Sequence, residues 1–88
     1  MPYIKPEERD ALSHTVMHLE NEAKTAHAGM VNYLITKLCS AWLVEHGVSY
    51  PSIASITGIL ENVKQEFYQR VARTYEDAKL KENGDVYN

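Results

Sequence analysis

The sequence has few of the residues that stabilise small folds through disulfide bonds or bound metal ions. Its 88 residues include one cysteine, Cys39, so no disulfide can form within the chain. Cys39 and the four histidines do not follow the spacing of a structural zinc site. A chain of this length buries only about 60–65% of the surface that it exposes when unfolded, so its own core is marginal. Self-association is the remaining common means of stabilisation, and we expect a homo-oligomer.

Long apolar runs and an excess of positive charge are also missing. No segment approaches the roughly 18 apolar residues of a membrane span, and the first residues lack the apolar segment of a secretory signal. The formal net charge of −3 argues against sequence-independent binding of DNA or RNA, which requires a basic surface. We therefore expect a cytoplasmic protein with neither a membrane nor a nucleic acid as its partner.

What the sequence does contain is helical periodicity. Apolar residues recur at spacings of three and four in the first, middle and last thirds of the chain, whereas strand patterns are weak. The pattern predicts helices over about residues 6–25, 30–46, 51–73 and 74–82. The sequence thus predicts an all-α protein, a three- to four-helix hairpin or bundle that forms a single domain over residues 1–88.

Glycines and one threonine indicate where these helices end. The segment "TAHAG" is expected to end the first helix near Gly29, and Gly47 is a plausible C-terminal cap of the second. Gly58 lies inside the third helix, where close packing would explain a residue that weakens helices. Thr74 followed by Asp77 forms a variant capping box, so the third helix is expected either to bend there or to restart as a fourth helix.

Tyrosine is unusually abundant beside scarce phenylalanine, with six Tyr and one Phe. On a continuous helix, Lys64, Tyr68 and Tyr75 would share one side of the apolar face, and Arg70 would lie on the other side. An aromatic surface beside a cation can stack a nucleobase and hold a phosphate. The alternative is that these residues form an oligomer interface or a solvated flank.

The remaining candidates for chemistry are weaker. His14 and His18 have the i, i+4 spacing of two metal ligands on a helix, but no third ligand accompanies them, so a surface role is preferred. Cys39 could pair with His27 or His46 as nucleophile and base, yet it borders an apolar face where a thiol usually packs as a small hydrophobe. The sequence predicts no catalytic residues, no metal site, no cofactor and no enzymatic activity.

Five blocks in order, "MPYIKPEER", "GMVNYLITKL", "SYPSIASITGILENVKQEFYQRV", "TYEDAK" and "NGDVY", extend over nearly the whole chain. Their order resembles a small phage-encoded family of unknown function and of about this length. The chain also resembles the phage anti-CBASS sponges, small helical oligomers that bind cyclic dinucleotide immune signals and hold them without hydrolysis. The resemblance implies a tetramer, with a hexamer as the alternative, in the host bacterial cytoplasm.

This resemblance leads to a first hypothesis, in which the protein sequesters a cyclic dinucleotide such as 3′,3′-cyclic GMP–AMP and so inhibits host CBASS signalling. Purines would stack on tyrosines, and phosphates would meet lysine or arginine where protomers adjoin. A second hypothesis is a helical inhibitor or adaptor that acts on a host enzyme through the wide apolar face around Trp42. For the first hypothesis, the ligand-binding residues are predicted to be Tyr3, Lys5, Asn32, Tyr33, Lys37, Lys64, Tyr68, Arg70 and Tyr75.

Overall fold

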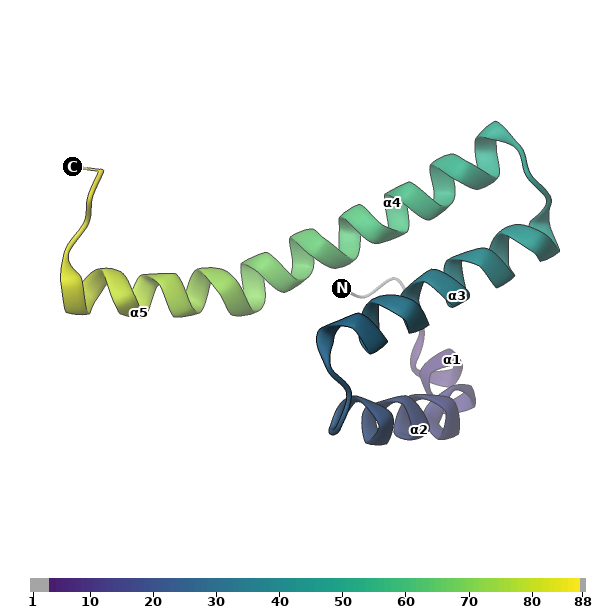
Figure 1. The fold of residues 1–88 in the computed structure, drawn as a ribbon, viewed down its shortest axis with the longest axis horizontal. Helices are drawn as coiled ribbons and strands as arrows, with labels where there is room; N and C mark the ends of the chain where they lie inside the picture. Colours follow the sequence, from purple (N-terminus) through teal and green to yellow (C-terminus); the bar gives the residue numbers. More distant parts are fainter. Residues whose placement is uncertain (1–3, 88) are drawn as a thin grey trace. The chain divides into compact units, whose positions relative to one another are not determined.

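The computed structural model describes residues 4–87, which form helices joined by short turns (Figure 1). Within these residues there is no strand, so the predicted all-α fold is confirmed. The chain divides into two compact units, Met1–Val48 and Ser49–Asn88, which we call the N-terminal unit and the C-terminal unit. The single domain predicted over residues 1–88 stays a prediction. The elements are α1 (Pro6–Ala11), α2 (Ser13–Ala23), α3 (Ala28–His46), α4 (Tyr50–Phe67), the π-helical segment η1 (Tyr68–Ala72) and α5 (Arg73–Asn83).

The N-terminal unit begins with two short helices where one was predicted. Pro6 opens α1, because a missing N–H costs nothing in the first turn, and the main-chain N–H of Lys5 donates to the Glu8 carboxylate over 3.1 Å. The prediction of one helix over residues 6–25 is wrong at Leu12, which separates α1 from α2 with φ −97° and ψ 2°. Its N–H bonds to the carbonyl of Arg9, three residues back, so the chain tightens and leaves the α-helical path.

The turn between α2 and α3 lies before Gly29 and not at it. After α2 the N–H groups of Lys24, Thr25 and Ala26 each reach three residues back, over 3.3–3.4 Å. The next helix starts with His27 as its N-cap, whose Nδ1 accepts the N–H of Met30 at 3.3 Å. Gly29 therefore lies in the first turn of α3, and the preceding helix ends at Ala23, slightly before the predicted bound at about residue 25. The predicted cap at Gly47 is confirmed, since its φ of 85° suits glycine and its N–H bonds to the Leu43 carbonyl.

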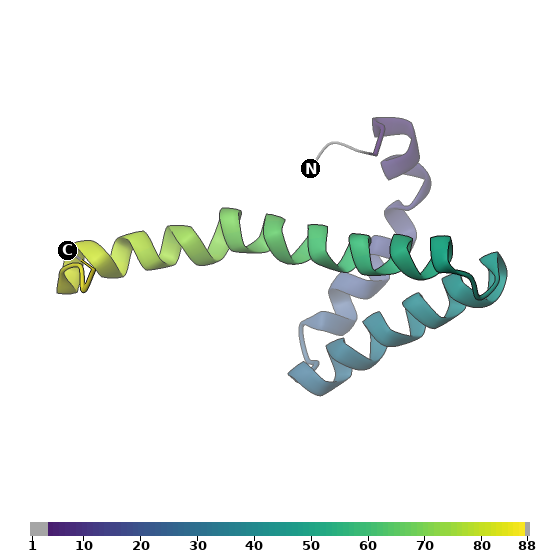
Figure 2. The same ribbon diagram turned by 90° about the horizontal axis from the view of Figure 1, so that it is seen from above.

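The C-terminal unit is one uninterrupted helical run from α4 through η1 to α5, as both views show (Figures 1 and 2). Ser49 caps its start, because the Ser49 hydroxyl oxygen accepts the N–H of Ser52 at 3.3 Å. Pro51 falls in the first turn, where its missing N–H is tolerated. The run ends at Asn83, followed by Gly84 with φ 85°, close to the predicted end at about residue 82.

A widened turn, and not a capped restart, marks the middle of this run. The N–H of Arg73 bonds to the carbonyl of Tyr68, five residues back, so this turn holds one residue more than an α-helical turn. Thr74 donates its hydroxyl to the carbonyl of Arg70 at 3.3 Å and caps nothing, so the predicted capping box is wrong. Figure 1 shows the helix axis bending between α4 and α5. Of the two alternatives that the sequence allowed here, a bend or a restarted helix, the structure has the bend.

Side chains in both units are unusually exposed. Among residues 4–87 no hydrophobic side chain is buried, and Ser52, with 8% of its surface exposed, is the one buried residue. Val63, Phe67 and Val71 recur along one face of the C-terminal unit, and more than half of each remains exposed. No atom outside the local helix backbone lies within 4 Å of a Cβ built on Gly58 in the described chain, so close packing does not explain this glycine there.

Candidate ligand-binding site

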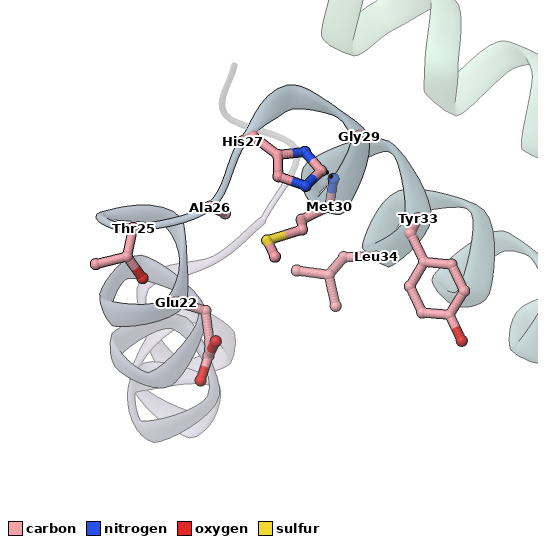
Figure 3. Close-up of a pocket in the computed structure, with 8 residues that line it drawn as sticks. All are labelled: Glu22, Thr25, Ala26, His27, Gly29, Met30, Tyr33 and Leu34. Carbon is pink, nitrogen blue, oxygen red and sulfur yellow. Dashed lines mark hydrogen bonds between the residues drawn. The ribbon is translucent and has the colours of Figure 1, made fainter.

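The N-terminal unit contains a pocket of about 440 Å³ where α2 turns into α3 (Figure 3). The last turn of α2 and the connection supply one part of its wall, and the first two turns of α3 supply the other. Most of the lining is apolar, with a few polar groups at defined positions, as in many small-molecule sites. The lining residues are Glu22, Thr25, Ala26, His27, Gly29, Met30, Tyr33 and Leu34.

The polar groups of this pocket have fixed hydrogen-bonding roles. The Nδ1 of His27 accepts the N–H of Met30, so this nitrogen carries no proton in the observed arrangement and the neutral ring carries its proton on Nε2. Glu22 also lies 4.0 Å from the Nε2 of His18, one turn back on the exposed side of α2. The pocket therefore offers the Nε2–H of His27, the hydroxyl of Thr25 and the carboxylate of Glu22.

Three of the predicted ligand-binding residues lie on α3. Tyr33 lines the pocket, and the ammonium of Lys37 lies 6.0 Å from the centre of the Tyr33 ring, at the outer limit of a cation–π contact. Asn32 follows the same helix, and its main-chain carbonyl accepts the Thr36 hydroxyl at 2.9 Å. Tyr33 and Lys37, both predicted ligand-binding residues, thus lie next to each other on α3.

Next to this pocket, an apolar groove of about 550 Å³ runs between α2 and α3. Leu34 belongs to both hollows, and Lys37 stands at the groove as its charged residue. Both helices contribute apolar side chains to this groove, and α3 contributes most of them. Its lining residues are Thr15, Leu19, Ala23, Val31, Leu34, Ile35, Lys37 and Leu38.

The predicted cations of the C-terminal unit each lie near an acidic residue of their own helix. The ammonium of Lys64 is 3.9 Å from the Glu61 carboxylate, and the Nε of Arg70 is 3.3 Å from the Glu66 carboxylate. Exposed ion pairs of this kind contribute only about 0–1 kcal/mol. An anionic ligand can therefore displace them at little cost.

The two predicted stacking tyrosines, Tyr68 and Tyr75, do not share one side of their helix. The widened turn of η1 adds a residue between them, which rotates every later position by about 100° relative to a continuous α-helix. Glu76 consequently occupies the place predicted for Tyr75, and the Tyr68 hydroxyl donates to the Glu76 carboxylate at 3.2 Å. Tyr75 instead lies beside Lys79, whose ammonium is 5.6 Å from the centre of the Tyr75 ring.

The remaining predicted residues belong to the start of the chain. Lys5 precedes α1, where its main chain is held by Glu8. Tyr3 lies outside the described residues. The predicted role of Tyr3 and Lys5 in ligand binding stays a prediction.

The histidines that could have served Cys39 as a base are engaged elsewhere. His27 caps α3 through Nδ1. His46 stacks on Trp42, with ring centres 3.8 Å apart, and donates its Nδ1–H to the Trp42 carbonyl at 2.9 Å. Both imidazoles thus serve the ends of α3. Within residues 4–87, no group of three or more His, Cys, Asp or Glu side chains is arranged to hold a metal ion.

Sequence reasoning missed Glu22, Thr25 and Met30 as site residues. Glu22 and Met30 are eight residues apart and belong to different helices. They reach one pocket because the chain leaves α2 at Ala23 and enters α3 at Ala28. The signal that could have found them is the short segment before His27, the N-cap of α3. The sequence predicts that this helix begins at about residue 30, whereas it begins at Ala28 in the structure.

Comparison with known proteins gives one match. No curated protein and no solved structure matches this chain. Within residues 4–87, no helix combines the length and the apolar character needed to cross a membrane. Residues 1–86 match a family described as a domain of unknown function, DUF6899. That match covers nearly the whole chain and confirms the expected membership in a family of unknown function. The chain therefore belongs to the DUF6899 family.

Proposed function

We propose that this protein binds a cyclic dinucleotide such as 3′,3′-cyclic GMP–AMP and sequesters it without cleaving it. In this role it acts as a phage immune-evasion protein in the host bacterial cytoplasm and inhibits CBASS signalling by lowering the free signal. The proposal is for a stoichiometric binding protein and not for an enzyme.

The observation that supports the proposal most directly is the arrangement on α3. A tyrosine, Tyr33, lines a pocket of about 440 Å³, and the ammonium of Lys37 is 6.0 Å from its ring centre. A purine can stack on such a ring while its phosphate meets the neighbouring cation. Tyr75 and Lys79 repeat the pairing in the C-terminal unit, at 5.6 Å.

The exposed apolar faces of both units support assembly of several copies. A chain in which none of the described hydrophobic side chains is buried gains stability when copies cover one another. A homo-oligomer would place cations such as Lys64 and Arg70 of different protomers around one ligand. A tetramer is the preferred assembly and a hexamer the alternative.

Calorimetric titration with a panel of cyclic di- and trinucleotides tests the proposal. We expect dissociation constants well below about 10 μM for at least one cyclic dinucleotide, equivalent to more than about 7 kcal/mol of binding free energy. Heating the complex should release the ligand chemically intact. Binding weaker than this for every member of the panel, or release of a cleaved product, would overturn the proposal.

The apolar groove between α2 and α3 favours a second candidate function. A helical face of a host enzyme could fill this groove, in which case the protein is an inhibitor or adaptor that acts through protein contacts. Affinity capture from host lysate, combined with mass determination of the isolated protein, separates the two. A stable monomer that captures one host protein and binds no cyclic dinucleotide would favour this second function.

A further inference from the structure

The pocket at the turn between α2 and α3 combines an apolar wall with a carboxylate. Met30 and Leu34 form one wall, and Tyr33 extends it toward the surface (Figure 3). A polarizable thioether and an aromatic ring are good contacts for the face of a planar heterocycle. Among the described residues that line the pocket, Glu22 alone is acidic.

This carboxylate distinguishes one purine from the other. An ionised carboxylate only accepts hydrogen bonds, and its two oxygens can accept from two adjacent donors. The Watson–Crick edge of guanine presents two such donors, N1–H and the N2 amino group. Adenine presents one donor, N6, beside the N1 acceptor, whose lone pair repels a carboxylate. Charge-assisted pairs of donors to a carboxylate are also the stronger hydrogen bonds.

The donors of the pocket suit the rest of a guanine. The Thr25 hydroxyl and the Nε2–H of His27 are available to acceptors such as O6 and N7, because the Nδ1 of His27 is used by the Met30 N–H. The ammonium of Lys37 lies 6.0 Å from the ring centre of Tyr33, on α3 beyond the pocket, where a phosphate attached to the base through its ribose can reach it. The base thus points inward and the phosphate outward.

We propose that this pocket receives the guanine base of a cyclic dinucleotide and that Glu22 is the residue that selects guanine over adenine. The inference rests on the proposed function, since it names the base that the site reads. It also assigns a binding role to Glu22, Thr25 and Met30, which the sequence pattern does not indicate.

Calorimetry with cyclic di-GMP and cyclic di-AMP tests the selection. The wild-type protein should bind cyclic di-GMP at least about tenfold more tightly than cyclic di-AMP. Glu22→Gln keeps the size of the side chain but replaces one acceptor by a donor, so it should weaken cyclic di-GMP binding about tenfold and leave cyclic di-AMP binding unchanged. Glu20→Gln, the same change on the same helix but outside the pocket lining, is the matched control and should alter neither affinity.

A second measurement does not depend on affinity alone. In proton NMR of bound cyclic di-GMP, the guanine N1–H should be protected from exchange in the wild-type protein and in Glu20→Gln, and exposed in Glu22→Gln. Equal affinity of the wild type for the two dinucleotides, or a Glu22→Gln variant with wild-type selectivity and protection, overturns the inference alone. If no cyclic dinucleotide binds the wild-type protein, the inference and the proposed function both fail.

Discussion

The two units contain the same local pairing and use it differently. In each, a tyrosine is followed four residues later by a lysine whose ammonium lies 5.6–6.0 Å from the ring centre. In the N-terminal unit the chain turns back after α2, so Tyr33 borders a pocket. In the C-terminal unit Tyr75 lies along one unbroken helical run. The i, i+4 spacing on a helix is therefore enough to place a tyrosine beside a lysine, but a pocket forms only where the chain turns back next to that pair.

The units also differ in what stabilises them. The C-terminal unit is a single helical run with exposed pairs such as Lys64–Glu61 and Lys79–Glu82, and exposed pairs contribute little. Isolated helices are marginal in water, so most of their stability comes from packing of an apolar face. The apolar face of α4 and η1 must therefore be covered for this unit to be stable. The N-terminal unit can form part of its structure through its own turns and caps.

The largest expected effect concerns that apolar face. Phe67, 61% exposed, lies near its middle, and Phe67→Asp would place a carboxylate in any interface that covers it. We expect the proposed homo-oligomer to lose at least about 2 kcal/mol of association free energy and to dissociate at micromolar concentration. Light scattering gives the mass. Gln69→Asp adds the same charge off this face and should keep the oligomer. An unchanged mass with a lower melting temperature for Phe67→Asp would show that the face is covered within one protomer.

The next largest effect is the loss of cyclic dinucleotide affinity when a stacking tyrosine is removed from either unit. Tyr33→Ala and Tyr68→Ala should each weaken cyclic dinucleotide binding by about 1–3 kcal/mol if a base stacks on each ring. Tyr68→Phe keeps the ring and removes only the hydrogen bond to Glu76, so its affinity should stay close to that of the wild type. Calorimetry on all three variants measures this. A loss for Tyr33→Ala alone would confine base stacking to the N-terminal unit.

These comparisons show which features the sequence could predict. The all-α fold, the cap at Gly47 and the stop at Gly84 depend on local periodicity and on glycine at positive φ, so a single sequence suffices. The break at Leu12 and the widened turn after Tyr68 change the register by small differences in hydrogen bonding that a periodic pattern does not resolve. One extra residue in that turn is enough to exchange Tyr75 for Glu76 beside Tyr68.

The candidate site is predictable to a smaller extent than the fold. Tyr33 and Lys37 could be paired from their spacing, because both lie on one helix. Glu22 and Thr25 join Tyr33 in the pocket from the other side of a turn, so their position depends on backbone geometry that composition does not reveal. A site built by a turn therefore requires the structure.

A smaller effect concerns the N-terminal cap of α4, Ser49. Ser49→Ala removes the hydroxyl that accepts the Ser52 N–H at the start of α4, and we expect a loss of about 1 kcal/mol in the free energy of unfolding. Ser49→Asp supplies another capping oxygen and should retain most of the stability. Urea unfolding followed by far-UV circular dichroism measures both. Equal losses for the two variants would mean that the hydroxyl acts through its contact with the Ser52 side chain and not as a cap.

The smallest effect concerns one glycine in each unit. Gly58 lies inside α4, and in the described chain nothing lies within 4 Å of an added Cβ, so Gly58→Ala should raise the free energy of unfolding by about 0.5–1 kcal/mol. At Gly29 the same methyl group would meet the Cε1 of His27 at 3.0 Å and its Nδ1 at 3.2 Å. The ring must then shift and weaken its bond to the Met30 N–H, so Gly29→Ala should gain less or lose stability. Urea unfolding of both variants tests the difference. If Gly58→Ala instead lowers stability and changes the oligomer mass, a second copy packs closely against Gly58.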